Sequence, residues 1–261
     1  MSDEPGQCQD FPRGDDPPPT PVSESEGAPL ASGRQSRGTS SAENLARVRR
    51  KPDRARYDTA AVHAVLDAAP FCHVATVRHG RPVVLPMVHG RVGDMLVLHG
   101  SAAAGLFRDM RRASPVCVTA TLFDGLVLAR SARNHSVNYR SVTVHGDATE
   151  VTDPGDVMIG MWALVEHIAP GRWEQVRKPL LAELRDTAMW QVPIEVASVK
   201  ARSGSTIDPQ SDLALPVWAG HIPAELVFGQ PVPADNLPAS VHPAGRVELN
   251  SALGRVAWPR R

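Results

Sequence analysis

The first regular pattern of apolar residues begins after Tyr57 and has helical spacing. Asp58 or Thr59 can cap the start of a helix here, and Pro70 ends it. The apolar positions between these limits recur at Ala61, Val62, Val65, Leu66 and Ala69. We therefore expect an amphipathic helix with one face turned toward a core.

Three short apolar runs follow this helix, and the first of them is rich in β-branched residues. They cover 71–77, 82–88 and 95–99, and they are separated by turn residues at His79-Gly80 and at 90–94. This spacing predicts three strands joined in a meander. A short helix is then expected at 101–112.

The rest of the patterned region predicts more strands with helices between them. The runs 116–122 and 126–130 flank Asp124-Gly125, which is a strong hairpin signal. Further elements are expected as a strand at 140–146 continuing into 148–151, helices at 154–167 and 179–187, and a strand at 192–199. Six or more mostly antiparallel strands with a few covering helices predict an α+β domain built on a small β-barrel.

Proline marks the limits of this domain. Of the 24 prolines, seven lie in residues 1–50 and eight lie from Pro209 onward. The first 50 residues are otherwise filled with Ser, Gly, Asp and Glu, so they cannot bury enough apolar surface to offset the entropy of ordering. We expect a disordered arm at 1–56, a folded domain at 57–223 and a Pro-rich tail at 224–261.

Charge and cysteine content narrow the class of protein. The chain has 28 basic and 28 acidic residues, and this balance argues against a nucleic-acid partner. Cys8, Cys72 and Cys117 cannot form a complete set of disulfides, which suits a reducing compartment. No long apolar run and no secretion signal is evident, so we expect a cytoplasmic protein with no membrane association.

The common catalytic and metal-binding motifs are missing from the sequence. Its ten histidines show neither H-E-x-x-H nor a pair at i, i+4, and no C-x-x-C occurs, so no metal is expected. The nucleophile elbow G-x-S-x-G and the dinucleotide and P-loop fingerprints are also missing.

One segment has the chemistry of an anion site. His99-Gly100-Ser101 stands where a strand gives way to a helix, and Ser101 is a good N-cap. A helix N-terminus presents unpaired amide donors, which attract a phosphate. Arg108 and Arg112 follow on roughly the same helical face. Taken alone, the segment fits an ordinary capped helix with solvent-facing arginines better than a phosphate site.

Several further segments, in their order along the chain, resemble the flavin-nucleotide-binding branch of the pyridoxamine 5'-phosphate oxidase-like family. This branch includes nitroimidazole-reductase-like proteins, and the resemblance covers Tyr57 to Pro223. Its most specific parts are the D-G-L-V-L-A-R-S-A and N-Y-R-S-V runs. The matching segments are 81–87, 124–132, 135–142, 198–204 and 215–220.

The resemblance implies a split β-barrel, a homodimer, and FMN bound in a cleft at the subunit interface. It implies that the isoalloxazine ring lies along Val84, Leu85, Pro86 and Met87, and the phosphate near His99, Gly100 and Ser101. The residues that match a later cofactor-facing strand and a C-terminal tryptophan near the site are Tyr139, Arg140, Ser141 and Trp218.

The chain departs from the family pattern at the phosphate. Many relatives carry Arg or Lys where this sequence has Gly105 and Leu106, so Arg108 is the candidate countercharge. Arg140 or Arg130 could stabilise the negative charge of a reduced flavin. Arg133-Asn134 also replaces a more usual aromatic-His pair, which bears on substrate preference.

The resemblance implies an FMN-dependent oxidoreductase that transfers hydride or electrons to or from a small-molecule substrate. Two alternatives stay open. The chain could bind flavin without turnover, as a carrier, store or redox sensor, or the same barrel could hold haem or a deazaflavin. No catalytic residue is assigned from the sequence, although His99, His135 and Tyr139 are candidate proton donors.

Overall fold

The computed structural model describes residues 44–112, 115–238, 240–241 and 255–256, and every structural statement below concerns these residues. Most of the expected N-terminal arm therefore lies outside the described residues. The described chain starts before the domain boundary expected at Tyr57, because Ala46 is buried and Ala55–Arg56 already pair within a sheet.

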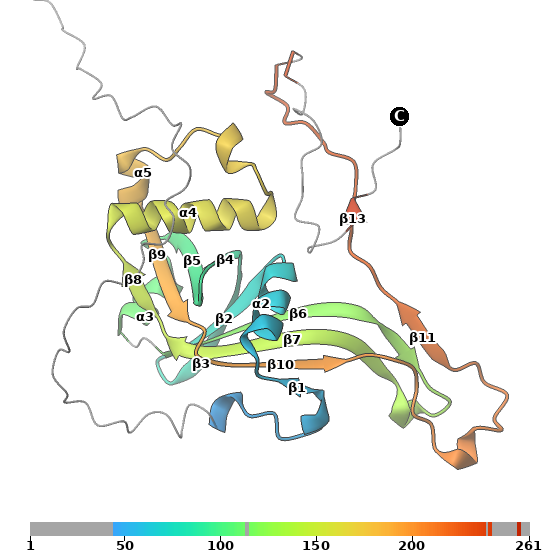
Figure 1. The fold of residues 1–261 in the computed structure, drawn as a ribbon. Helices are drawn as coiled ribbons and strands as arrows, with labels where there is room; N and C mark the ends of the chain where they lie inside the picture. The colour runs from blue at the N-terminus through green and yellow to red at the C-terminus, as the bar shows by residue number, and fades with distance from the viewer. Residues whose placement is uncertain (1–43, 113–114, 239, 242–254, 257–261) are drawn as a thin grey trace, which may run out of the picture. The chain divides into compact units, whose positions relative to one another are not determined.

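The larger sheet is antiparallel throughout, in the order β1-β10-β7-β6-β2-β3, with β11 paired to β6 as well (Figure 1). The long strands β6 and β7 form its centre. The bounds are β1 Ala55–Arg56, β2 Cys72–Arg78, β3 Arg81–Met87, β6 Pro115–Leu128, β7 Ser136–Asp147, β10 Val196–Arg202 and β11 Gly220–Pro223.

A second antiparallel sheet has the order β4-β5-β9-β8. Its strands are β4 His89–Val92, β5 Met95–Ser101, β8 Thr149–Val151 and β9 Thr187–Pro193. A short parallel pair joins β12 Val227–Phe228 to β13 Arg255–Val256. Mostly antiparallel strands with a few helices confirm the expected α+β class.

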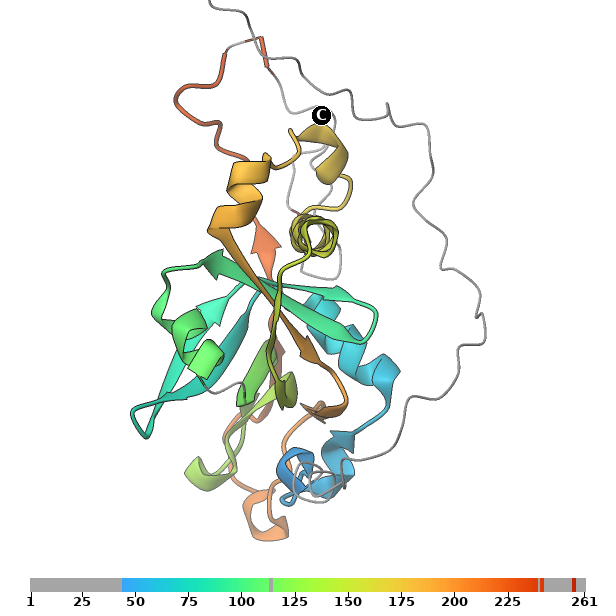
Figure 2. The ribbon, with the colours of Figure 1, turned by 90° about the vertical axis from the view of Figure 1, so that its left-hand side faces the viewer.

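The sheets are accompanied by the α-helices α2 Thr59–Ala68, α3 Gly105–Arg112, α4 Pro154–Ile168 and α5 Leu181–Asp186. The side chain of Asp58 caps α2 as expected, accepting a hydrogen bond from the Ala61 amide at 2.9 Å. Helix α4 lies over the second sheet, and Figure 2 views it nearly along its axis. Short 3-10 turns occupy Pro52–Arg54, Ala132–Asn134, Trp173–Gln175 and Gln210–Asp212.

The main core lies between α2 and the inner faces of the two sheets. Leu66 of α2 packs in one cluster with Val74, Val118 and Leu96, and none of these side chains is exposed. A smaller cluster joins α4 to the second sheet. There the backbones approach closely, because a Cβ on Gly90 would lie 2.9 Å from the carbonyl carbon of Ala163.

The turn expected at 90–94 is wrong, because β4 occupies His89–Val92. The meander is wrong as well: β4 and β5 pair with each other in the second sheet, so the chain leaves the first sheet after β3. The glycine that looked like a turn residue is Gly90, and its role is to admit α4.

The hairpin expected at Asp124-Gly125 is also wrong. β6 continues from Pro115 to Leu128 with a bulge between Phe123 and Gly125. Gly125 has φ +147°, and a Cβ there would collide with the carbonyl oxygen of Ile222 in β11. The glycine thus allows a neighbouring strand to approach.

Each of two other expected strands is two strands in the structure, one in each sheet. The strand expected at 192–199 is split after Pro193 into β9 and β10, and the one at 140–151 is split at Ala148 into β7 and β8. The helix expected at 101–112 begins only at Gly105, because Ser101 still belongs to β5.

Candidate functional site

The residues expected along a flavin ring lie in β3, the last strand on the described path of the larger sheet. Val84 is 54% exposed and Leu85 is 41% exposed, although both are apolar. An edge strand presents backbone donors and acceptors on its outer side. The strand therefore combines exposed apolar side chains with backbone hydrogen-bonding groups. A planar ring with polar atoms on its rim can pack on the side chains and form hydrogen bonds with the backbone.

The expected phosphate segment ends β5. The Ser101 hydroxyl accepts a hydrogen bond from the amide of Ala103 at 3.3 Å, and the Ser101 carbonyl accepts one from Ala104 at 2.9 Å. Ser101 thus holds the turn that leads into α3 and does not cap the helix itself. Gly100 is needed for packing, because a Cβ there would lie 2.7 Å from the Phe107 ring.

A residue that the sequence analysis missed, Arg78, stands beside this turn. Its guanidinium pairs with the Asp109 carboxylate at 2.7 Å, and Asp109 is only 6% exposed. A Cβ on Gly105 would lie 2.5 Å from a terminal nitrogen of the same guanidinium. Arg78 of β2 therefore covers the first residue of α3.

Two further arginines lie on the elements that meet at Arg78. Arg81 is directly opposite Arg78 in the register of β2 and β3. Arg108 is exposed on α3, and no ion pair joins it to another described residue. Figure 2 shows α3 beside the β2–β3 hairpin. The R-H-G-R run at 78–81 could have indicated that Arg78 and Arg81 are neighbours, because a tight turn places its first and last residues opposite each other.

The other predicted site residues lie elsewhere in the same sheet. Tyr139, Arg140 and Ser141 of β7 pair with Phe123, Leu122 and Thr121 of β6. Strand β2 reaches β6 only as far as the His73–Thr119 pair, so β2 and β6 both stand between this group and β3. Within one chain the structure does not bring the β7 group to the β3 group.

Both arginines expected to face a reduced flavin are engaged in ion pairs. Arg140 binds the Asp124 carboxylate at 2.8 Å, and this hydrogen bond raises the pKa of Arg140. Arg130 binds Asp208 at 2.8 Å, and the Asp208 side chain is 1% exposed. The Asp208 pair ties the loop before β11 to the end of β6.

Trp218 lies in this loop and is 64% exposed. A Cβ on Gly220 would lie 3.1 Å from its ring, so the indole rests against the start of β11. A second anchor holds the same loop, because the buried guanidinium of Arg202 donates hydrogen bonds to the side chain of Asn138 and the carbonyl of Ser205. These bonds hold the first part of the loop, and the contact with Gly220 places the Trp218 indole beside β11.

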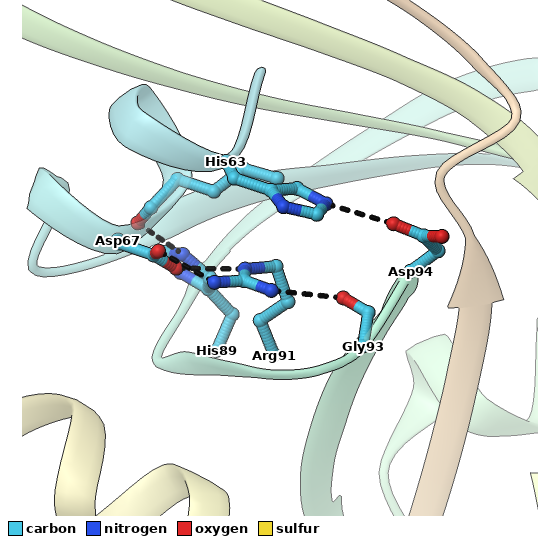
Figure 3. Close-up of polar contacts among 7 residues, drawn as sticks. His63, Asp67, His89, Arg91, Gly93 and Asp94 are labelled. Carbon is cyan, nitrogen blue, oxygen red and sulfur yellow. Dashed lines mark hydrogen bonds and ion pairs between the residues drawn. The ribbon is translucent and has the colours of Figure 1, made fainter. Parts of the chain in front are cut away.

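A separate group of polar side chains joins α2 to the β4–β5 hairpin (Figure 3). Arg91 grips Asp67 with two hydrogen bonds of 2.8 and 2.6 Å, and His63 contacts Asp94 at 3.0 Å. Within the described ranges, no group of three or more His, Cys, Asp or Glu side chains could hold a metal ion. These contacts brace α2 against the second sheet.

Residues 58–201 match the family model described as pyridoxamine 5'-phosphate oxidase. The chain belongs to this family. Because the match includes β2 to β9 and most of β10, the edge strand, the Ser101 turn and Arg78 all lie within the family domain.

Two solved structures resemble the chain over most of its length. The flavocytochrome Anf3 from Azotobacter vinelandii is 35% identical, with a TM-score of 0.74 over 82% of this chain and 97% of that one. The FAD and heme binding protein from Mycobacterium smegmatis is 31% identical, with a TM-score of 0.71 over 76% of this chain and 98% of that one. These likenesses confirm the expected split-barrel fold. No match was found among curated proteins.

None of the helices in the described ranges combines the length and the apolar character needed to cross a membrane.

Proposed function

We propose that this chain is a flavin-nucleotide-binding redox protein. The observation that carries the proposal is the identity of 35% and 31% with a flavocytochrome and with an FAD and heme binding protein, each spanning at least three quarters of this chain. The finer proposal, FMN as cofactor and hydride or electron transfer with a small molecule, rests on the sequence motifs.

The described residues fit the parts of a flavin nucleotide. β3 supplies a peptide edge with the exposed apolar side chains Val84 and Leu85, which suits an isoalloxazine ring. Arg78 and Arg108 supply positive charge beside the Ser101 turn, which suits a phosphate. A bound flavin would supply the electron-transfer chemistry, while the protein binds and orients it.

A homodimer is part of the proposal. Leu126 of β6 stands between Val137 of β7 and Ile222 of β11, and all three apolar side chains are exposed. Such a row favours contact with another protein surface. A second copy would also supply the β7 residues that lie apart from β3 in a single chain.

Light scattering of the purified protein tests the homodimer. The wild type is expected at twice the mass of one chain. Leu126→Asp should shift it toward the monomer, because burying a carboxylate in an apolar interface is costly. Ile159→Asp changes an equally exposed residue on α4 and should leave the dimer intact. A monomeric wild type would refute this part of the proposal.

A second candidate function is a flavin protein that also holds haem. It is favoured because both solved structures above are described as haem proteins or flavocytochromes. Imidazole is a common axial ligand of haem iron, and this chain has exposed histidines at His73, His99 and His221. Addition of haemin should give a shifted Soret band if this candidate is correct, and a spectrum of free haemin if it is not.

Anaerobic mixing of the flavin-loaded protein with NADH or NADPH separates enzyme from carrier. An oxidoreductase is expected to lose its flavin absorbance and to recover it when an electron acceptor is added, over many cycles. If neither NADH nor NADPH reduces the flavin, and only dithionite does, the result would instead favour a carrier or sensor.

A further inference from the structure

The positive charge at the start of α3 comes from the guanidinium of Arg78, a residue of the neighbouring strand β2. Gly105 leaves the first position of α3 without a side chain, and the Arg78 guanidinium lies over it, 2.5 Å from where a Cβ would be. Gly105 of α3 leaves the space, and Arg78 of β2 supplies the charge.

The Arg78 guanidinium is held in a fixed orientation. Asp109 accepts its Nε–H and contacts a terminal nitrogen, both at 2.7 Å. Because Asp109 is buried and Arg78 is 38% exposed, the pair leaves part of the guanidinium facing solvent. An arginine fixed through one carboxylate keeps further N–H donors for an anion.

Several hydrogen-bond donors lie around the start of α3. Gly105, Arg108 and Asp109 occupy positions i, i+3 and i+4 of α3, so they share one side of the helix. Ser101 and the turn amides lie directly before the same helix. A phosphate here would meet two arginines from different elements, and the Asp109 carboxylate would be neutralised by Arg78.

We propose that Arg78 binds the 5'-phosphate of the flavin nucleotide, and that buried Asp109 is the positioning residue that aims it. This inference rests on the proposed function above, since it names the residues that hold the phosphate of that cofactor. It assigns Gly105 a role as well: the missing side chain admits the guanidinium.

Titration of the flavin-free, full-length protein with FMN and with riboflavin tests the inference, because only FMN carries the phosphate. Quenching of flavin fluorescence gives both dissociation constants. Arg78→Ala and Arg78→Gln should weaken FMN binding about tenfold or more, the loss of one charge-assisted hydrogen bond, and should leave riboflavin binding unchanged. Arg185→Ala removes an exposed arginine from α5 and should change neither constant.

Gly105→Ala is a second variant that keeps every charge and favours the helix, so it should fold. Its Cβ forces the guanidinium aside, and FMN binding should weaken several-fold while riboflavin binding is kept. Asp109→Asn should act in the same direction.

The possible failures are distinct. If the wild type prefers FMN to riboflavin and the Arg78 and Gly105 variants keep that preference, the inference is overturned while the proposed function stands. If the wild type binds neither FMN nor FAD, the proposed function fails and the inference fails with it.

Discussion

The imidazole rings of His89 and His167 lie 4.6 Å apart, centroid to centroid, in the buried layer between α2, β4 and α4. Each ring reaches the end of α2: Nε2 of His89 lies 3.0 Å from the Leu66 carbonyl oxygen, and Nε2 of His167 lies 2.9 Å from that of Ala69. A carbonyl only accepts, so both Nε2 atoms carry the proton. The pair thus ties β4 and α4 to the end of α2, and at Leu66 the imidazole adds to the hydrogen bond of 3.2 Å that the carbonyl already accepts from the Ala69 amide.

This histidine pair should make the protein less stable in mild acid. Burial, followed by the neighbouring His167, lowers the pKa of His89 from 6.5 to about 4, and burial also lowers the pKa of His167. Between about pH 6.5 and pH 4 the unfolded chain binds more protons than the folded one. Stability is therefore full above this window and falls as the pH is lowered, by about 2 kcal/mol between pH 7 and pH 5 from His89 alone.

Urea unfolding at pH 7 and pH 5 measures this loss. His89→Gln keeps an N–H donor for the Leu66 carbonyl but does not titrate, so its stability should change less with pH than that of the wild type. His221→Gln, at an exposed histidine of β11, should retain the wild-type dependence. If all three proteins lose the same free energy of unfolding between pH 7 and pH 5, the buried histidine pair does not control the loss of stability in acid.

Gly90→Ala should destabilise the fold by about 1–3 kcal/mol. The added methyl group would meet backbone atoms of Ala163 and Leu164 at 2.9 and 3.0 Å, and backbone cannot move aside as a flexible side chain can. Thermal or urea unfolding gives the change. Gly229→Ala is the matched control, because nothing lies within 4 Å of its Cβ position, and it should be neutral.

Arg108→Ala should weaken FMN binding about tenfold without altering the unfolding temperature. Arg108 is exposed and has no ion pair with a described residue, so the folded chain loses no ion pair with it. Fluorescence titration and a melting curve measure the two quantities. Unchanged affinity would remove Arg108 from the phosphate site, and a large drop in unfolding temperature would mean that its role is structural.

Removal of residues 1–43 should leave both the unfolding temperature and the flavin content unchanged. The composition of this segment predicts no core of its own. The cut keeps Ala46, which is buried, and the hydrogen bond of 3.0 Å from the Val48 amide to Tyr57. A marked loss of either property would contradict the expectation that the arm is disordered.

Local pattern predicted the helices and most strands, while tertiary contacts decided the rest. Asp58 and Pro70 limit α2 as expected, because capping and chain termination act within a few residues. Gly90 and Gly125 look like turn residues in the sequence, yet both lie in strands at points where another backbone passes close by. No periodicity reveals such an approach.

Some residues of the candidate site could be predicted from local sequence, while others depend on tertiary contacts. The β3 residues and Ser101 could be found from motifs, because each lies in one short segment. The R-H-G-R run indicates only that Arg78 lies opposite Arg81. The contacts of Arg78 with Asp109 and Gly105 are not visible in the sequence, since these residues are 31 and 27 positions away and meet it only when α3 packs on β2. The family resemblance implies that Arg140 faces the flavin, and its ion pair with Asp124 is not visible in the sequence.

Flavin binding by this chain is best measured by the absorbance spectrum of the freshly purified full-length protein, recorded before and after heat release and filtration. We expect flavin bands that pass into the filtrate as FMN or FAD, together with recovery of these bands when flavin is returned to the stripped protein. A protein that is colourless as purified and that binds neither FMN nor FAD on titration would contradict this expectation.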